Sequence, residues 1–244
     1  MFAERDFRLI LNARNASRLN EFRQSLGENK DILTIPADLS NDEGVEKLIR
    51  EVEKKGHQVD VLVNNAARDD RHSLESVTSD YFDERIATNL KHQLFAAQAV
   101  AGPMAAAGGG SIINVHSVEG MRGYPGDPVY GAMKAAVNHF STCLASGYGR
   151  NGIRVNGMGV DLTQTAQVDY ISGYEDVEHL WESWAPVGRL GWPEDQARVA
   201  LFLASDLSAF VTGHNIPVDG GSHAGGGWFF SPDAKRFVNR PKSL

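Results

Sequence analysis

The feature that most constrains the fold of this chain is a regular alternation of short apolar runs with longer segments of helical periodicity. Turn residues bound the runs, an order typical of βαβ units that build a parallel sheet. The sequence therefore predicts an α/β fold, a Rossmann-like, doubly wound parallel sheet. Strands are expected at Phe7–Asn12, Asp31–Pro36, Val59–Asn64, Ser111–His116, Ile153–Gly157 and His214–Val218.

Helices are expected between these strands. Asn41 to Gly44 begins one helix with polar capping residues and an acidic first turn. Three more are predicted at Ser79–Met104, Val129–Tyr148 and Pro193–Ala204, the last with a proline in its first turn.

The domain organisation follows from what the sequence lacks. No internal repeat or linker divides it, so we expect one domain over residues 1–244. Two irregular stretches stand out, a proposed substrate lid at 161–185 and a C-terminal tail at 222–244. In α/β proteins such stretches often lie where ligands bind, but they are equally often surface loops with small cores of their own.

Composition excludes several classes of protein. The net charge of −7 argues against nucleic-acid binding, which concentrates Lys and Arg. One cysteine, Cys143, and the absence of CxxC and HExxH spacings argue against a disulfide framework and a metal site. The chain shows neither a secretory signal nor a membrane span, so we expect a cytoplasmic protein with a small-molecule substrate.

One pair of side chains has the spacing of an acid/base device. Tyr130 and Lys134 lie four residues apart in a predicted helix and therefore project from one face. Ser117 comes thirteen residues earlier, just past a predicted strand. A nearby ammonium is expected to lower the pKa of the phenol, and the serine can hold a substrate oxygen. Taken alone, this spacing is most often that of an ordinary helix surface.

The order of motifs resolves that ambiguity. From about Phe7 to Ser222 the chain resembles the short-chain dehydrogenase/reductase family. The motifs that carry the resemblance are Asp38 in Pro36-Ala37-Asp38-Leu39, Asn64-Asn65-Ala66-Ala67, Asn89 in Thr88-Asn89-Leu90, the Ser117, Tyr130 and Lys134 set, Ile153-Arg154-Val155-Asn156, and Asp219-Gly220-Gly221.

The resemblance implies a role for each member of the catalytic set. Tyr130 is expected to be the general acid/base and Ser117 to orient the carbonyl or hydroxyl. Lys134 is expected to lower the pKa of Tyr130 and to contact the nicotinamide ribose, and Asn89 to hold a water in the proton relay. The implied chemistry is hydride transfer between NAD(P) and a carbonyl or alcohol.

The resemblance also implies a nucleotide edge. Asp38 and Leu39 are expected near the adenine, and Asn65 and Ala66 on the adenosine side. Arg14 stands where a cation meets a 2′-phosphate, whereas a carboxylate there favours NAD, so we favour NADP. Arg14 is equally well explained as a solvated residue at a helix entry.

Three departures from the family affect the cofactor side. The family begins with a strand and a T-G-x-x-x-G-x-G turn that cradles the pyrophosphate, whereas Met1–Asp6 resembles only the end of the helix after it. Ala67 replaces a glycine, and Val160-Asp161 replaces Pro-Gly beside the nicotinamide. We therefore expect an N-terminal truncation relative to the family and cofactor binding that is weak or absent.

The expected truncation poses a structural problem, because the absent strand belongs at the centre of the sheet. Its loss leaves two facing strand edges with unpaired backbone groups. Strand Phe7–Asn12 then pairs directly with Val59–Asn64, another segment or subunit fills the gap, or the first two strands are displaced.

Three function classes stay open at this stage. The leading one is an NADP-linked oxidoreductase acting on a small alcohol or ketone. The alternatives are a cofactor-independent lyase or isomerase with the Tyr130 phenolate as base, and a non-catalytic relative. We also expect a homotetramer or homodimer with helices Ser79–Met104 and Val129–Tyr148 in the interface, because their Ala-rich faces permit close approach.

Overall fold

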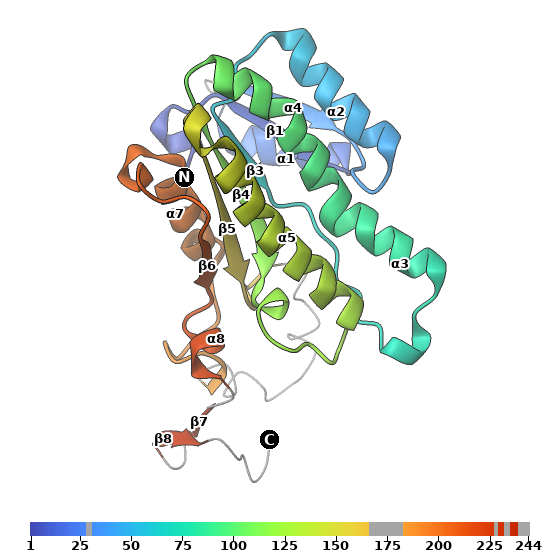
Figure 1. Cartoon of the computed structure of the whole chain (residues 1–244), viewed down its shortest axis with the longest axis vertical. Coiled ribbons are helices and arrows are strands. Elements are labelled where there is room, and N and C mark those ends of the chain that lie inside the picture. Colours follow the sequence, from blue (N-terminus) through green and yellow to red (C-terminus); the bar gives the residue numbers. More distant parts are fainter. Residues whose placement is uncertain (28–30, 166–182, 227–228, 232–234, 239–244) are drawn as a thin grey trace.

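The computed structural model describes residues 1–244 except 28–30, 166–182, 227–228, 232–234 and 239–244 (Figure 1). The N-terminal half contains β1 (Leu9–Ala13), α1 (Ala16–Ser25), β2 (Ile32–Pro36), α2 (Asp42–Lys55), β3 (Val61–Asn64), α3 (Ser79–Ile86) and α4 (His92–Ala106). The C-terminal half contains β4 (Gly110–Ser117), α5 (Pro128–Tyr148), β5 (Ile153–Val160), α7 (Pro193–Ala204), β6 (Asn215–Val218), α8 (Ser222–Gly225), β7 (Phe229–Ser231) and β8 (Arg236–Val238). The predicted α/β class is confirmed.

The parallel strands form two separate sheets. β1 and β2 pair with each other, and the second sheet has the order β3-β4-β5-β6. At its centre β4 and β5 pair over eight positions, from Gly110 beside Ile153 to Ser117 beside Val160. In the tail, β7 and β8 form a short antiparallel hairpin.

The expected gap lies between β1 and β3. Among the residues that the structure describes, no ladder joins β1 to β3, so the direct pairing of these two strands is not observed. Val63 on β3 is 40% exposed, whereas Ile113, its register partner on β4, is fully buried. The Val63 side chain, on the strand that borders the gap, is therefore partly in water.

Alternation along β4 sends successive side chains to two different cores. Ile112 packs with residues of α4 and α5, such as Ala97 and Ala145. Ile113 packs with residues of α7, such as Leu203, on the other face. Figure 1 shows the same layering, with α4 and α5 in front of the sheet and α7 behind it. The sheet is thus doubly wound, as the sequence predicts.

Two contacts attach the β1–β2 sheet to the rest of the molecule. Phe2, at the start of the chain, packs against the core beside α7. On the other side α2 lies against α4, where Asp42 and Lys91 form an ion pair. The predicted start of α2 is confirmed, because the Asn41 side chain accepts a hydrogen bond from the Gly44 backbone N–H at 2.8 Å.

One predicted helix is interrupted. The expected helix Ser79–Met104 consists of α3 and α4 joined by a π-helical turn at Ala87–Lys91. The extra residue per turn changes which side chains face inward, and it brings Asn89 into the interior. A count based on 3.6 residues per turn does not reveal such a turn.

The open edge of β3 makes a prediction about stability. Ile113→Ala should lower the free energy of unfolding by about 2–5 kcal/mol, because it leaves a cavity in a filled core. Val63→Ala should cost less than about 1 kcal/mol, because part of that side chain is already in water. Urea unfolding of both variants measures the difference. Equal costs would show that the edge of β3 is covered in solution.

Candidate active site

The carboxyl end of β4 positions the first site residue. Register with β5 places Ser117 beside Val160, whose carbonyl accepts a hydrogen bond from Ser117 Oγ at 3.2 Å. The same oxygen accepts a hydrogen bond from the Glu119 backbone N–H at 3.2 Å. Ser117 also lies close enough to the Tyr130 side chain to oppose the rise of the phenol's pKa. The serine is therefore fixed by the strand end and directed at the phenol.

Helix α5 supplies the other two residues. Asp127 caps its N-terminus and accepts a hydrogen bond from the Tyr130 backbone N–H at 2.9 Å. One turn later, Lys134 Nζ lies 5.4 Å from the centroid of the Tyr130 ring. A Cβ on Gly120 would lie 2.5 Å from the Ala135 backbone nitrogen, so glycine permits the close approach of the loop after β4 to α5. The structure thus brings Ser117, Tyr130 and Lys134 together.

Burial dominates the electrostatics of this set. It raises the pKa of Tyr130, and the charge of Asp69 raises it further, while the Ser117 side chain opposes the shift. Burial also lowers the pKa of Lys134 to about 8, with Asp69 opposing. The expected lowering of the Tyr130 pKa is therefore wrong, because desolvation disfavours the phenolate.

Asn89 holds a backbone segment next to this set. Its Oδ1 accepts a hydrogen bond from the Arg68 backbone N–H at 3.2 Å, and its Nδ2 donates to the Arg68 carbonyl at 3.0 Å. The buried Arg85 donates to the same carbonyl and to Asp70, each at 2.9 Å. Asn89 therefore anchors the loop after β3. Its expected water-holding role stays a prediction.

Sequence reasoning missed three residues around the site: Asp69, Arg85 and Asp127. Asp127 accepts a short hydrogen bond from the Tyr81 hydroxyl, and the Arg85 guanidinium lies 4.8 Å above the Tyr81 ring. Asp69 accepts a hydrogen bond from the Tyr124 hydroxyl at 3.4 Å. Two adjacent carboxylates after Asn64-Asn65-Ala66-Ala67 were the available signal.

Comparisons with known proteins agree with this geometry. A family model described as enoyl-(acyl carrier protein) reductase matches residues 1–223. The chain is 39% identical to a probable galactose dehydrogenase of Rhizobium meliloti over 77% of this chain and 73% of that protein. It is 38% identical to a D-xylose 1-dehydrogenase of Caulobacter vibrioides, over 75% of this chain and 72% of that protein.

Solved structures are similar as well. A gluconate 5-dehydrogenase from Burkholderia cenocepacia, in complex with NADP and tartrate, matches with a TM-score of 0.81 and 30% identity, over 91% of this chain and 88% of that one. The chain belongs to the short-chain dehydrogenase/reductase family. As a member of that family it is an oxidoreductase.

In this dehydrogenase/reductase the expected nucleotide edge lies beside the ends of β1, β2 and β3. Arg14 lies close enough to Asp38 for its charge to lower the pKa of that carboxyl, although the hydrogen bond from Ser40 is the larger cause. Asn65 and Ala66 are exposed after β3. Leu39 is partly buried after β2. The candidate cofactor residues thus fall in two groups, at β1–β2 and at β3.

Asp161, in the Val160-Asp161 pair that departs from the family pattern, makes structural contacts with two other segments. The Asp161 carboxylate accepts a short hydrogen bond from Ser222 and forms an ion pair with Arg122 at 3.3 Å. Arg122 also pairs with Glu119 at 2.8 Å. Asp161 therefore ties the end of β5 to α8 and to the loop after β4. Most of the expected lid at 161–185 lies outside the described residues.

Other predictions concern residues outside the catalytic set. His116, the neighbour of Ser117 on β4, is fully buried, and burial lowers its pKa to about 4. Alternation along the strand turns it to the opposite face from Ser117. In the described part of the chain, no group of His, Cys, Asp and Glu side chains could hold a metal ion. No described helix has the length and apolar character of a membrane span.

The lowered pKa of Lys134 predicts a pH dependence of stability. Between pH 8 and 10.5 the unfolded chain keeps a proton on this lysine that the folded chain has lost, so stability rises with pH there. From pH 7.5 to 9.5, the free energy of unfolding should rise by about 2 kcal/mol more in the wild type than in Lys134→Met. Urea unfolding at both pH values checks this.

The exposed Lys55, at the end of α2, provides the control. Lys55→Met should leave the pH dependence of the wild type intact. If the stability of Lys134→Met had the same pH dependence as that of the wild type, the lowered pKa of the buried Lys134 would be contradicted.

Proposed function

We propose that this protein is an NADP-linked oxidoreductase that interconverts a small alcohol and ketone by proton transfer through Tyr130. The observation that carries the proposal is the assembly of Ser117, Tyr130 and Lys134 at the carboxyl end of β4. A bound nicotinamide nucleotide supplies or accepts the hydride. The side chains of this set handle the proton and the substrate oxygen.

The raised pKa of Tyr130 defines its role near neutral pH. A protonated phenol next to the Ser117 hydroxyl can donate a proton to the oxygen of a carbonyl that is being reduced. In the oxidation direction, Tyr130 accepts the proton of the substrate hydroxyl. The Lys134 ammonium beside the ring stabilises the phenolate that forms. Ser117 orients the substrate oxygen in both directions.

Two observations support residues that would hold the nucleotide. Lys134 is buried, and among the described residues no carboxylate forms an ion pair with it, so its ammonium is available to a ribose hydroxyl. Arg14 provides a positive charge next to Asp38, which favours the 2′-phosphate of NADP. Leu39, Asn65 and Ala66 complete the proposed nucleotide surface. The NADP complex of the similar gluconate 5-dehydrogenase supports this choice.

The proposal makes a kinetic prediction. The wild type should oxidise NADPH in the presence of small ketones faster than it oxidises NADH. Tyr130→Phe should lower kcat by about 10²–10⁴-fold, because the proton donor is lost. Tyr148→Phe, at the other end of α5, is the matched control and should keep the activity. Absorbance of NADPH measures all three proteins.

Two results would overturn the proposal. No turnover together with no NADPH binding by calorimetry would exclude the oxidoreductase activity for this chain. Exchange of a substrate C–H with deuterated solvent in nucleotide-free protein, lost in Tyr130→Phe, would instead assign Tyr130 to a lyase or isomerase.

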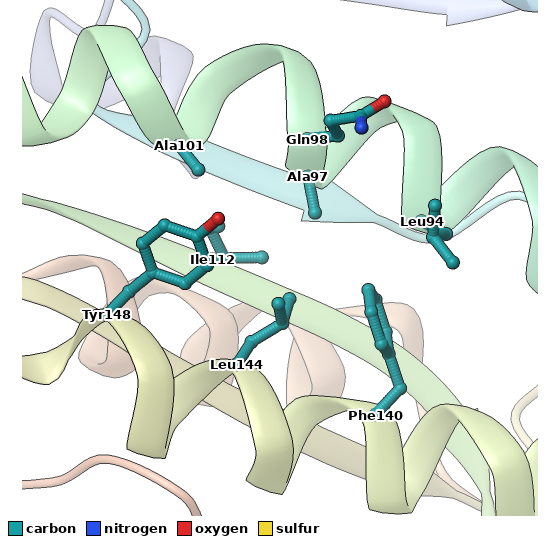
Figure 2. Close-up of a pocket in the computed structure, with 8 residues that line it drawn as sticks. All are labelled: Leu94, Ala97, Gln98, Ala101, Ile112, Phe140, Leu144 and Tyr148. Atoms are coloured by element: carbon teal, nitrogen blue, oxygen red, sulfur yellow. The ribbon is translucent and has the colours of Figure 1, made fainter.

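We also propose self-association through α4 and α5. Figure 2 shows a groove between these helices, lined by residues that include Leu94, Phe140, Leu144 and Tyr148. Its volume is about 180 Å³. Leu94 and its neighbour Phe95 are exposed apolar side chains. A second copy of the chain, related by a two-fold axis, would cover them with its own α4 and α5.

Light scattering tests the assembly. At micromolar concentration the mass should exceed the 26.6 kDa of one chain. Leu94→Glu should bring the mass to that of a monomer, because it places a charge in the apolar contact. Leu207→Glu changes an exposed leucine after α7 and should leave the assembly intact. A monomeric wild type would contradict the proposal.

A further inference from the structure

Asp69 lies next to the catalytic set without belonging to it. Its Oδ2 accepts a hydrogen bond from the Tyr124 hydroxyl at 3.4 Å, and the Tyr124 ring stands edge-on to the Tyr130 ring with centroids 6.1 Å apart. The charge of Asp69 acts on both Tyr130 and Lys134. A carboxylate therefore faces the region where the substrate oxygen meets Tyr130.

The loop that carries Asp69 is held on both sides. The preceding residue, Arg68, has both of its backbone polar groups bonded to Asn89. The following residue, Asp70, forms an ion pair with the fully buried Arg85 at 2.9 Å. Asp69 Oδ1 accepts a hydrogen bond from the Arg71 backbone N–H at 3.1 Å. The carboxylate is thus presented by a fixed backbone, as a specificity group requires.

The charges around Asp69 favour a ligand group that donates a hydrogen bond over a ligand group that carries a negative charge. Burial raises the pKa of Asp69 and the charge of Asp127 raises it further, and Glu119 acts on Tyr130 in the same direction as Asp69. Arg122, the nearby guanidinium, is already paired with Glu119 and Asp161. Each carboxylate oxygen can accept two hydrogen bonds, so Asp69 keeps acceptor capacity for a ligand. A substrate carboxylate would meet like charge at this position.

We propose that Asp69 is the specificity-determining residue that selects a neutral polyhydroxylated substrate. Its carboxylate accepts a hydrogen bond from a hydroxyl on the carbon next to the reacting carbon, and it repels substrates that carry a carboxylate. Asp69 forms no covalent bond and transfers no proton. This inference rests on the proposed function and names its substrate class: polyols, and aldoses in their hemiacetal form. Oxidation of the hemiacetal passes the C1 hydride to NADP and the proton of the C1 hydroxyl to Tyr130, and it leaves a lactone.

Kinetics with matched substrates test the inference. With NADP, the wild type should use D-galactose or D-xylose at least about 10-fold better in kcat/KM than D-gluconate. It should also prefer D-galactose to 2-deoxy-D-galactose, which lacks the neighbouring hydroxyl. A site that hydrogen-bonds a substrate hydroxyl rejects the analogue without it strongly.

Asp69→Asn should remove both preferences. We expect the KM for D-galactose to rise about 10-fold or more, with little change for the 2-deoxy sugar, and the preference over D-gluconate to collapse. Asp83→Asn, an exposed carboxylate on α3, is the matched control and should keep the wild-type ratios. Calorimetry of D-galactose binding to the NADPH-loaded proteins, in which the sugar has no hydride acceptor, gives a readout that does not depend on turnover.

The outcomes separate this inference from the proposed function. Turnover with unchanged substrate ratios in Asp69→Asn would overturn the role of Asp69 and leave the oxidoreductase intact. Equal use of D-galactose and its 2-deoxy analogue by the wild type would do the same without any variant, should Asp69→Asn fail to fold. Absence of both turnover and NADPH binding would overturn the proposed function itself.

Discussion

Parallel pairing of β4 with β5 is the constraint on which the site depends. Eight paired positions fix the two strands against each other, and both strands are almost entirely buried. The last pair sets Ser117 against Val160, at the edge where parallel strands end together. Chain reversal after β4 then brings α5 back across the same strands. Tyr130 therefore reaches Ser117 because the central ladder ends where it does.

The site contains two buried ionisable groups, a protonated Tyr130 and a Lys134 whose pKa of about 8 leaves it mainly an ammonium near neutral pH. Burial opposes the phenolate of Tyr130 and the ammonium of Lys134 alike, so the isolated charges are costly and the pair of opposite charges is favourable. A proton that leaves Tyr130 thus leaves a phenolate that depends on Lys134. The carboxylate of Asp69 acts against the phenolate and with the ammonium, and it sets this balance from outside the pair.

Much of the fold could be predicted from the sequence because its signals are local. Pro193 and the apolar period after it mark α7 at the observed ends, and the strand runs were found to within a few residues. The spacing of Tyr130 and Lys134 needed only helix geometry to place them on one face. The motif order then supplied Ser117.

Features that depend on tertiary packing could not be predicted in this way. The π-helical turn at Ala87–Lys91 inserts one residue into an otherwise regular period. Arg85 reads as a solvated helix residue, yet it is fully buried and anchors a loop. The direction of the Tyr130 pKa follows from burial, which no local pattern reports. Whether β1 pairs with β3 depends on how whole layers pack, which the sequence of either strand does not report.

Because the two sheets are separate, the free energy of local unfolding should differ between them. A two-stranded ladder is marginal in water, so β1 and β2 depend on Phe2 and on the contact of α2 with α4. Loss of those contacts frees β1 and β2 while the β4–β5 ladder stays closed. We therefore expect the backbone amides of β1 and β2 to exchange with deuterium through a sub-global opening. The edge that carries Arg14 and Asp38 can open while Ser117, Tyr130 and Lys134 remain assembled.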